Sequence, residues 1–171
     1  MKKLTKKSLD ELASTMSIIP KSELNSMIGM YGSDCFWRCV SYLNTGAITE
    51  SAAASYALDY WTSQMGGASI SADYMLSTYG AGMSYSDARS YAQTHGLQRQ
   101  IIFVDPSKIS YYQSNGYSSV GSAGHAIVVS SAIRNSNGDT TGYNVYDPQN
   151  NLSFTIGLSE SGQNNGTHWV Y

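Results

Sequence analysis

A β-hairpin around residues 125–146 is the feature that most constrains the fold of this 171-residue chain. Residues 125–133 form an apolar run typical of a buried strand, and residues 142–146 have the composition of a second strand. Residues 135–139 (Asn-Ser-Asn-Gly-Asp) lie between them and favour a tight turn. Because the strands of a hairpin are antiparallel, the end of the second returns beside the start of the first. We therefore expect Asp147 to lie next to His125.

The remaining patterns place helices before the sheet. Helical signals cover residues 34–43, 50–65, 71–79 and 84–95, and the second helix has an apolar face of Ala53, Tyr56, Ala57, Tyr60 and Trp61. Strands are expected at 99–104, 152–157 and 167–171, with a short helix after Asp105-Pro106. Helices followed by an antiparallel sheet predict an α+β fold.

Composition narrows the classes of function. The net charge of −2 offers no basic surface for nucleic acid. The longest apolar runs, 101–104 and 126–129, are far shorter than a membrane span. With two cysteines, no CxxC and three scattered histidines, neither a metal site nor another cofactor is expected. The composition is that of a globular chain.

Cys35 is the candidate nucleophile. It directly follows Asp34, a probable N-cap, so its sulfur would lie at the start of a helix. The free N–H groups and dipole of a first turn favour the reactive thiolate. Cys39 lies one turn further along, beside Val40 and Leu43, and is expected to face the core.

His125 and Asp147 complete a catalytic constellation. His125 opens an apolar strand after Gly124, and a histidine at a strand end can lean toward a helix start. Asp147 can accept a hydrogen bond from the ring and fix its tautomer. An Asp-Pro pair is also a common turn opener, and an isolated strand-end histidine is often incidental. The hairpin brings His125 and Asp147 together, so the separate sequence signals predict one site.

The order Asp34-Cys35, Gly124-His125-Ala126-Ile127-Val128-Val129 and Tyr146-Asp147-Pro148 resembles the papain-like cysteine peptidase superfamily. The nearest resemblance is to the peptidases that process double-glycine leaders. It spans about residues 33–149 and implies a papain-like fold, with a thiolate–imidazolium pair that cleaves an amide through an acyl-enzyme. In this resemblance Cys35 is the nucleophile, His125 the base and Asp147 the residue that orients the base.

The chain departs from the family at one position. The family usually has a glutamine about six residues before the cysteine, where it donates to the oxyanion. Here that position is Gly29, and residues 1–63 contain no glutamine. The N–H of Cys35 and the 32–34 loop are candidate replacements, with Ser33 and Asn25 as side-chain candidates.

Residues 9–29 resemble the double-glycine leaders of peptides secreted by Bacteroidetes-type bacteria. That resemblance divides the chain into a leader-like or pro-segment at 1–30 and a peptidase domain at 31–171. It implies a leader-processing export transporter as a partner, and a secreted or periplasmic location reached without a Sec signal. Without export the protein would be cytoplasmic. The family's small pair is Gly29-Met30 here rather than Gly-Gly.

Two alternatives remain open. Residues 34–38 (Asp-Cys-Phe-Trp-Arg) are similar to the Asn-Cys-Leu-Phe-Arg of ovarian-tumour-type deubiquitinases, which cleave isopeptide bonds. The second alternative is a non-catalytic, exported toxin-like or binding protein on a papain-like scaffold, because the oxyanion glutamine is missing. The distances among Cys35, His125 and Asp147 discriminate between an intact site and a degenerate one.

Overall fold

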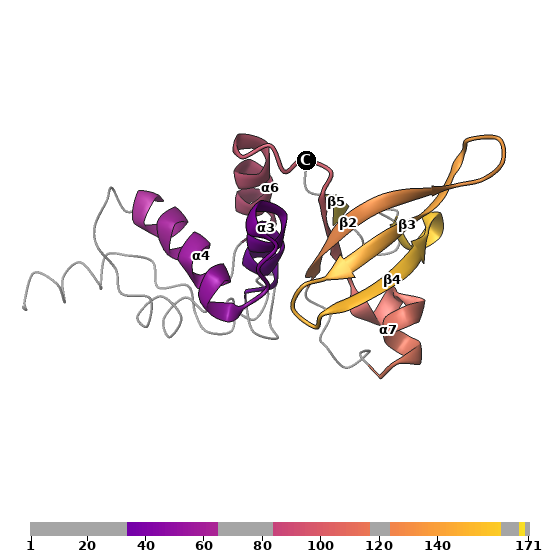
Figure 1. The fold of residues 1–171 in the computed structure, drawn as a ribbon, viewed down its shortest axis with the longest axis horizontal. Helices are drawn as coiled ribbons and strands as arrows, with labels where there is room; N and C mark the ends of the chain where they lie inside the picture. Colours follow the sequence, from indigo (N-terminus) through magenta and orange to yellow (C-terminus); the bar gives the residue numbers. More distant parts are fainter. Residues whose placement is uncertain (1–33, 65–83, 117–123, 162–167, 170–171) are drawn as a thin grey trace, which may run out of the picture.

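The computed structural model describes residues 34–64, 84–116, 124–161 and 168–169. Within these ranges the chain forms an α+β fold, with helices grouped beside one antiparallel sheet (Figure 1). The leader-like segment, Asn25, Ser33 and the helix expected at 71–79 lie outside the described residues. The predicted α+β class is confirmed.

Three helices form the helical part of the fold. They are α3 (Cys35–Thr45), α4 (Glu50–Gln64) and α6 (Tyr85–Thr94), and their ends agree with the predicted ends to within two residues. Local chemistry explains the boundaries: Ser84 accepts a hydrogen bond from the N–H of Asp87 and caps α6. Gly46 ends α3 in the left-handed conformation at φ 75°. Among the described residues no helix is both long and apolar enough to cross a membrane.

The sheet has five strands in the order β4-β3-β2-β1-β5. They are β1 (Ile101–Val104), β2 (His125–Arg134), β3 (Thr140–Asp147), β4 (Leu152–Gly157) and β5 (His168–Trp169). The predicted hairpin is confirmed, because β2 and β3 pair antiparallel with Val129 opposite Val145. Gly138 adopts φ 86° in its turn, a conformation that glycine reaches without strain.

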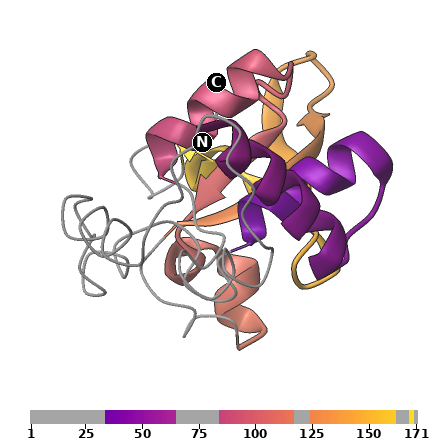
Figure 2. The same cartoon turned by 90° about the vertical axis from the view of Figure 1, so that its left-hand side faces the viewer.

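Short helical segments cover the face of the sheet opposite to α3, α4 and α6. The helix expected after Asp105-Pro106 is a 3₁₀ turn, Pro106–Lys108, followed by α7 (Ser110–Ser114). In Figures 1 and 2, α6 lies above the sheet and α7 lies below it. A short helix that the sequence patterns did not predict, α8 (Leu158–Ser161), follows β4.

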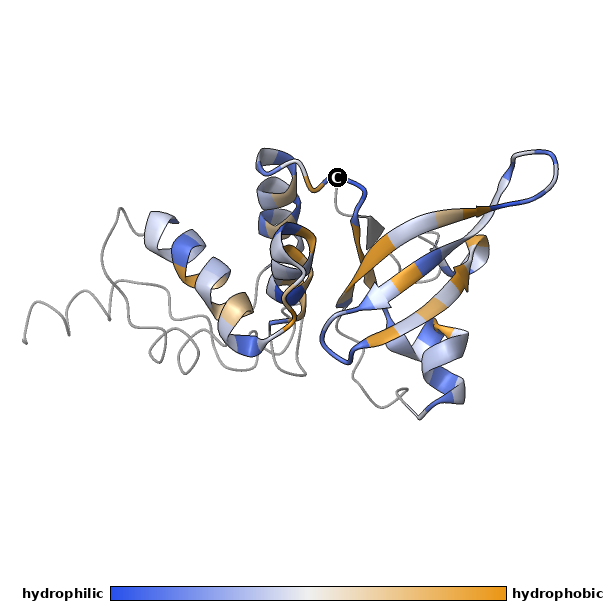
Figure 3. Cartoon of the chain, viewed as in Figure 1, coloured by the Kyte–Doolittle hydropathy of each residue, from blue (hydrophilic) through white to orange (hydrophobic). Residues whose placement is uncertain are grey.

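The first of two apolar clusters, here called the helical core, lies between the helices and the sheet. Its buried members are Cys35, Phe36, Trp37, Cys39, Val40, Ala53, Ala57, Ala88, Ala92, Leu97, Ile101, Phe103, Ala126 and Val128. Figure 3 shows the apolar side of α3 turned toward the strands. On α4 only Ala53 and Ala57 are buried, whereas Tyr56, Tyr60 and Trp61 pack at the cluster's margin and are partly exposed. The predicted apolar face of α4 is therefore buried only at its small residues.

The second cluster, here called the α7 core, lies on the opposite face of the sheet. Its buried members are Ile102, Val104, Ile109, Tyr112, Ile127, Val145, Phe154 and Ile156. Successive residues of β1 and β2 alternate between the two clusters, as the two-residue period of a strand requires. Both faces of the central strands are thus buried, which accounts for the continuous apolar runs that predicted them.

Candidate active site

Cys35 is the first residue of α3, and its side chain is buried against the sheet. The N–H of Ala126, the second residue of β2, points at the Cys35 Sγ atom with an N···S distance of 3.4 Å. First-turn N–H groups of a helix have no intrahelical acceptor, so the sulfur is near the positive end of α3 as well. Both features direct N–H groups toward the sulfur.

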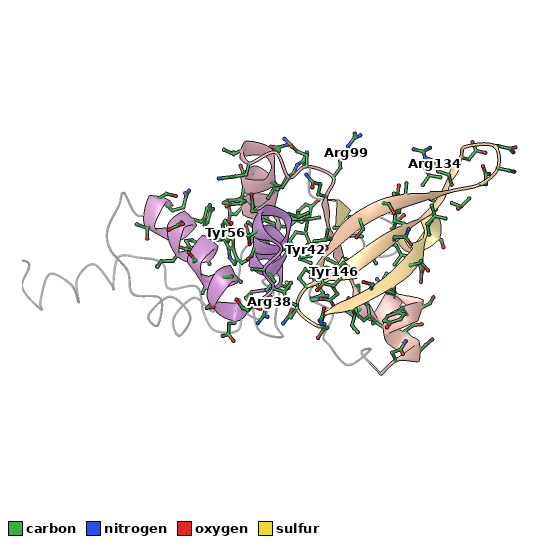
Figure 4. The ribbon with its side chains drawn as sticks, viewed as in Figure 1. Arg38, Tyr42, Tyr56, Arg99, Arg134 and Tyr146 are labelled. Carbon is green, nitrogen blue, oxygen red and sulfur yellow. The ribbon has the colours of Figure 1, made fainter. Side chains whose placement is uncertain are left out.

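Asp34 occupies the N-cap position but does not cap α3 through its side chain. Its carboxylate accepts a 2.6 Å hydrogen bond from Arg38 Nε, one helical turn later. Arg38 also donates to the Ile48 carbonyl at 2.8 Å and lies 4.0 Å from Glu50, so it joins the start of α3 to the start of α4 (Figure 4). The predicted side-chain cap is therefore wrong, because a nearby guanidinium binds a buried carboxylate more strongly than a neutral N–H does.

His125 and Asp147 meet as the hairpin predicts. His125 Nε2 lies 2.9 Å from Asp147 Oδ2, and both side chains are buried. The Cys35 thiol also interacts with the His125 ring and favours its protonated form, raising the pKa of His125. Since Nε2 faces the carboxylate, Nδ1 is the nitrogen left for the thiol. The three residues named from the sequence therefore form one connected Cys–His–Asp chain.

The Asp147 carboxylate accepts five hydrogen bonds. Oδ2 accepts from His125, from the Tyr112 hydroxyl at 2.7 Å and from Asn150 Nδ2 at 2.7 Å. Oδ1 accepts from the backbone N–H groups of Gln149 and Asn150 at 3.0 and 3.2 Å. Burial raises the pKa of Asp147, but the hydrogen bond and charge of His125, followed by the side-chain hydrogen bonds from Asn150 and Tyr112, outweigh it and lower the pKa to about 2. Asp147 is therefore ionised at neutral pH.

The pKa of His125 moves in the opposite direction. Burial lowers it, but the hydrogen bonds to Asp147 and then to Cys35 outweigh burial and raise the pKa from 6.5 to about 10. The ring therefore holds its second proton through the neutral range. A protonated ring between a thiol and a carboxylate matches a thiolate–imidazolium pair.

Cys39 has a different environment, one turn further along α3. Its side chain is fully buried in the helical core. Burial, followed by the charges of Cys35 and Asp147, raises the pKa of its thiol well above the ordinary value. Cys39 is thus a protonated, apolar core residue, as the sequence predicts.

Two neighbours of the site were not predicted from the sequence: Tyr112 and Asn150. Asn150 has a local signal, because an aspartate that opens a turn often binds the backbone two and three residues later. Tyr112 lies 35 residues before Asp147 and is one of 14 tyrosines, so no local pattern distinguishes it.

The oxyanion candidates Ser33 and Asn25 lie outside the described residues. Within the described ranges no cluster of three or more His, Cys, Asp or Glu side chains is arranged to hold a metal ion.

The two thiols should differ in reactivity. In wild-type protein we expect iodoacetamide to modify Cys35 and to leave Cys39 largely unmodified, because burial raises the pKa of the Cys39 thiol and keeps it protonated. Cys35→Ala should remove the fast modification, whereas Cys39→Ala should preserve it and lower the free energy of unfolding by about 1 kcal/mol. Mass spectrometry of digested protein and chemical denaturation measure the two effects. Preferential labelling of Cys39 would exchange the two assignments.

The ring of His125 should titrate far above an ordinary histidine. Because its pKa is raised, the ring is protonated below the raised value and loses its proton only as the pH increases toward about 10. ¹⁵N imidazole NMR should therefore show a doubly protonated ring at about pH 8. Cys35→Ala should lower the midpoint, and Asp147→Asn should lower it further, since the Asp147 hydrogen bond contributes more. A wild-type midpoint near 6.5 would contradict the charged ring.

Comparison with family models finds no match for this chain, and comparisons with curated proteins and with solved structures find none either. The function is therefore inferred from the geometry of Cys35, His125 and Asp147, together with the sequence resemblance.

Proposed function

We propose that the chain is a cysteine peptidase of papain-like type, with Cys35 as nucleophile, His125 as general acid and base, and Asp147 as the residue that orients His125. One observation carries the proposal: a buried histidine is hydrogen-bonded to a buried carboxylate at 2.9 Å and interacts with a thiol at a helix start, which favours the protonated ring. A structural histidine has no need of this pairing. Side chains from α3, β2 and β3 contribute one group each.

The reaction follows from the charges of the pair. The Cys35 thiolate attacks the carbonyl carbon of an amide, and the electrons of the C=O bond move to oxygen. Collapse of this tetrahedral species breaks the C–N bond, and His125 gives its proton to the leaving amine. The Cys35 thioester remains. His125, now neutral, takes a proton from water as the water attacks the thioester, and the acid is released as the thiolate re-forms.

Asp147 supports both halves of this cycle without taking the proton. Its pKa of about 2 keeps the carboxylate ionised when the adjacent ring is protonated. The 2.9 Å contact with Nε2 fixes the tautomer of the neutral ring, so that Nδ1 faces the sulfur. A carboxylate with five donors also resists rotation, which keeps the ring aligned with α3.

The oxyanion that forms in each step needs donors. The Cys35 N–H, at the first position of α3, is the backbone donor that the described residues offer. The family's glutamine position is Gly29, so a side-chain donor, if one is used, comes from Ser33 or Asn25. Because a single such donor contributes roughly 10²–10³-fold in rate, a backbone-only site is a slow peptidase.

The substrate class is a separate part of the proposal. We infer a peptide or protein amide, and the resemblance to double-glycine peptidases favours a main-chain peptide bond after small residues. The ovarian-tumour-like reading places the scissile bond on a lysine side chain instead. A fluorogenic peptide library and a matched set of isopeptide-linked substrates separate the two classes.

Activity should depend on the three site residues in a graded way. Cys35→Ala should abolish amide hydrolysis, and Asp147→Asn should lower kcat by roughly 10²–10⁴-fold, the range that acid–base catalysis contributes. Asp139→Asn makes the same chemical change in the exposed hairpin turn and should leave kcat unchanged. The measurement is hydrolysis of the best library substrate. If the wild-type protein and Cys35→Ala are equally inactive on every substrate, the protein is the non-catalytic alternative.

The leader-like segment gives a further test. We propose that residues 1–30 are an export leader that restrains the site until the segment is removed. Cys35 is only 1% exposed in the whole chain, so a reagent needs an opening to reach its sulfur. A chain of residues 31–171 should then react with a cysteine-protease probe faster than residues 1–171. Equal labelling of the two chains would exclude a restraining role for residues 1–30. The peptidase assignment would still be decided by the activity measurement.

A further inference from the structure

Tyr112 occupies a position in the site that the proposed reaction does not use. It belongs to α7, on the opposite side of the sheet from α3, and only 1% of its surface is exposed. Its hydroxyl donates to Asp147 Oδ2 at 2.7 Å, the same oxygen that binds His125. Its ring stands edge-on to the His125 ring, with centroids 6.0 Å apart at 76°. Tyr112 therefore touches both residues that control the thiol.

We propose that Tyr112 is a positioning residue of the Cys35 site, which holds the Asp147 carboxylate in place and ionised so that His125 stays aligned with the sulfur. The inference rests on the proposed function for its meaning in catalysis. Its physical content is a hydrogen bond between two buried side chains from distant parts of the chain, and that content is testable without any substrate.

The geometry favours a functional role over simple packing. The Tyr112 ring is already held by Phe154, at a centroid distance of 5.0 Å and an angle of 69°. A phenylalanine would make the same apolar contacts. The hydroxyl is what a phenylalanine would lack, and it donates to Asp147. Burial followed by the adjacent carboxylate raises the pKa of the phenol so far that it stays protonated and acts as a donor.

The effect on Asp147 has a definite sign. A donor to the charged form of a carboxylate lowers its pKa, so loss of the Tyr112 hydroxyl must raise the pKa of Asp147. The groups around the carboxylate are Cys35 and Cys39 from α3, His125 from β2, Tyr112 from α7, and Tyr146 and Asn150 from β3 and its turn. Apart from His125, none of these groups supplies positive charge. Without the Tyr112 hydroxyl, the Asp147 carboxylate would keep hydrogen bonds from His125 and from the turn residues Gln149 and Asn150.

The test compares Tyr112→Phe with Tyr111→Phe. Tyr111 is the neighbouring residue on α7, partly buried and stacked on Phe154 at 4.4 Å, and its substitution removes the same hydroxyl without touching Asp147. ¹³C NMR of the Asp147 carboxyl should show a midpoint raised by about one pH unit or more in Tyr112→Phe. In Tyr111→Phe it should stay near the wild-type value of about 2. Equal midpoints in the two variants would overturn the proposal.

A second readout follows the thiol itself. At about pH 3, Asp147 should be roughly half ionised in Tyr112→Phe and still mostly ionised in Tyr111→Phe, so alkylation of Cys35 should be about twofold slower in Tyr112→Phe. At about pH 8 the two rates should converge, since Asp147 is then ionised in both proteins. If Tyr112 had a purely structural role, its substitution would slow alkylation of Cys35 equally at both pH values. That outcome would contradict the positioning role.

One measurement needs no variant and so does not depend on how well Tyr112→Phe folds. In wild-type protein the Tyr112 hydroxyl proton should exchange slowly and show an NMR cross-peak to the His125 ring. Its absence would contradict the hydrogen bond. If no amide is hydrolysed by the wild-type protein, the peptidase proposal fails, whereas the Asp147 titration still decides the role of Tyr112.

Discussion

The buried carboxylate of Asp147 is the constraint on which the rest of this structure depends. An ionised carboxylate removed from water is strongly destabilising unless hydrogen bonds replace its hydration. Here the replacement comes from three parts of the chain: the turn that follows β3, His125 at the start of β2 and Tyr112 on α7. The register of the hairpin, the turn and the docking of α7 must all be correct before the carboxylate can be buried at an acceptable free energy.

The two apolar clusters hold in place the elements that surround the Asp147 carboxylate. The helical core sets the position of α3, and therefore of Cys35, against one face of the sheet. The α7 core sets the position of Tyr112 against the other face. Tyr42 of α3 packs on Tyr146 of β3, with ring centroids 4.6 Å apart, and ties the helical part to the strand that carries Asp147 (Figure 4). Groups from both faces thus meet at the start of β2, where His125 joins them.

Local patterns were enough to predict the framework of the site. The Asn-Gly turn and its flanking apolar runs predicted the hairpin, and antiparallel pairing then placed Asp147 beside His125. Helix-start chemistry placed Cys35 at the first position of α3, although the side-chain cap by Asp34 on which that prediction relied is not formed. The same pattern could not show that Arg38 would take the Asp34 carboxylate, because that choice depends on Ile48 and Glu50, which position the guanidinium. Tyr112 was beyond prediction, since its contact with Asp147 exists only after α7 docks on the sheet.

The proposed reaction needs support for two atoms, the Cys35 sulfur and the oxygen of the substrate, and the described residues support them unequally. The sulfur of Cys35 has an N–H donor from Ala126, a helix start and a charged histidine, all within the described residues. For the oxygen of a substrate, the same residues offer the Cys35 N–H. In the resemblance proposed for this chain, the glutamine position is Gly29. Alkylation of a thiol develops no oxyanion, whereas amide hydrolysis develops one in each half of the cycle. The ratio of the two rates therefore measures how complete the oxyanion site is, independently of how reactive the thiolate has become.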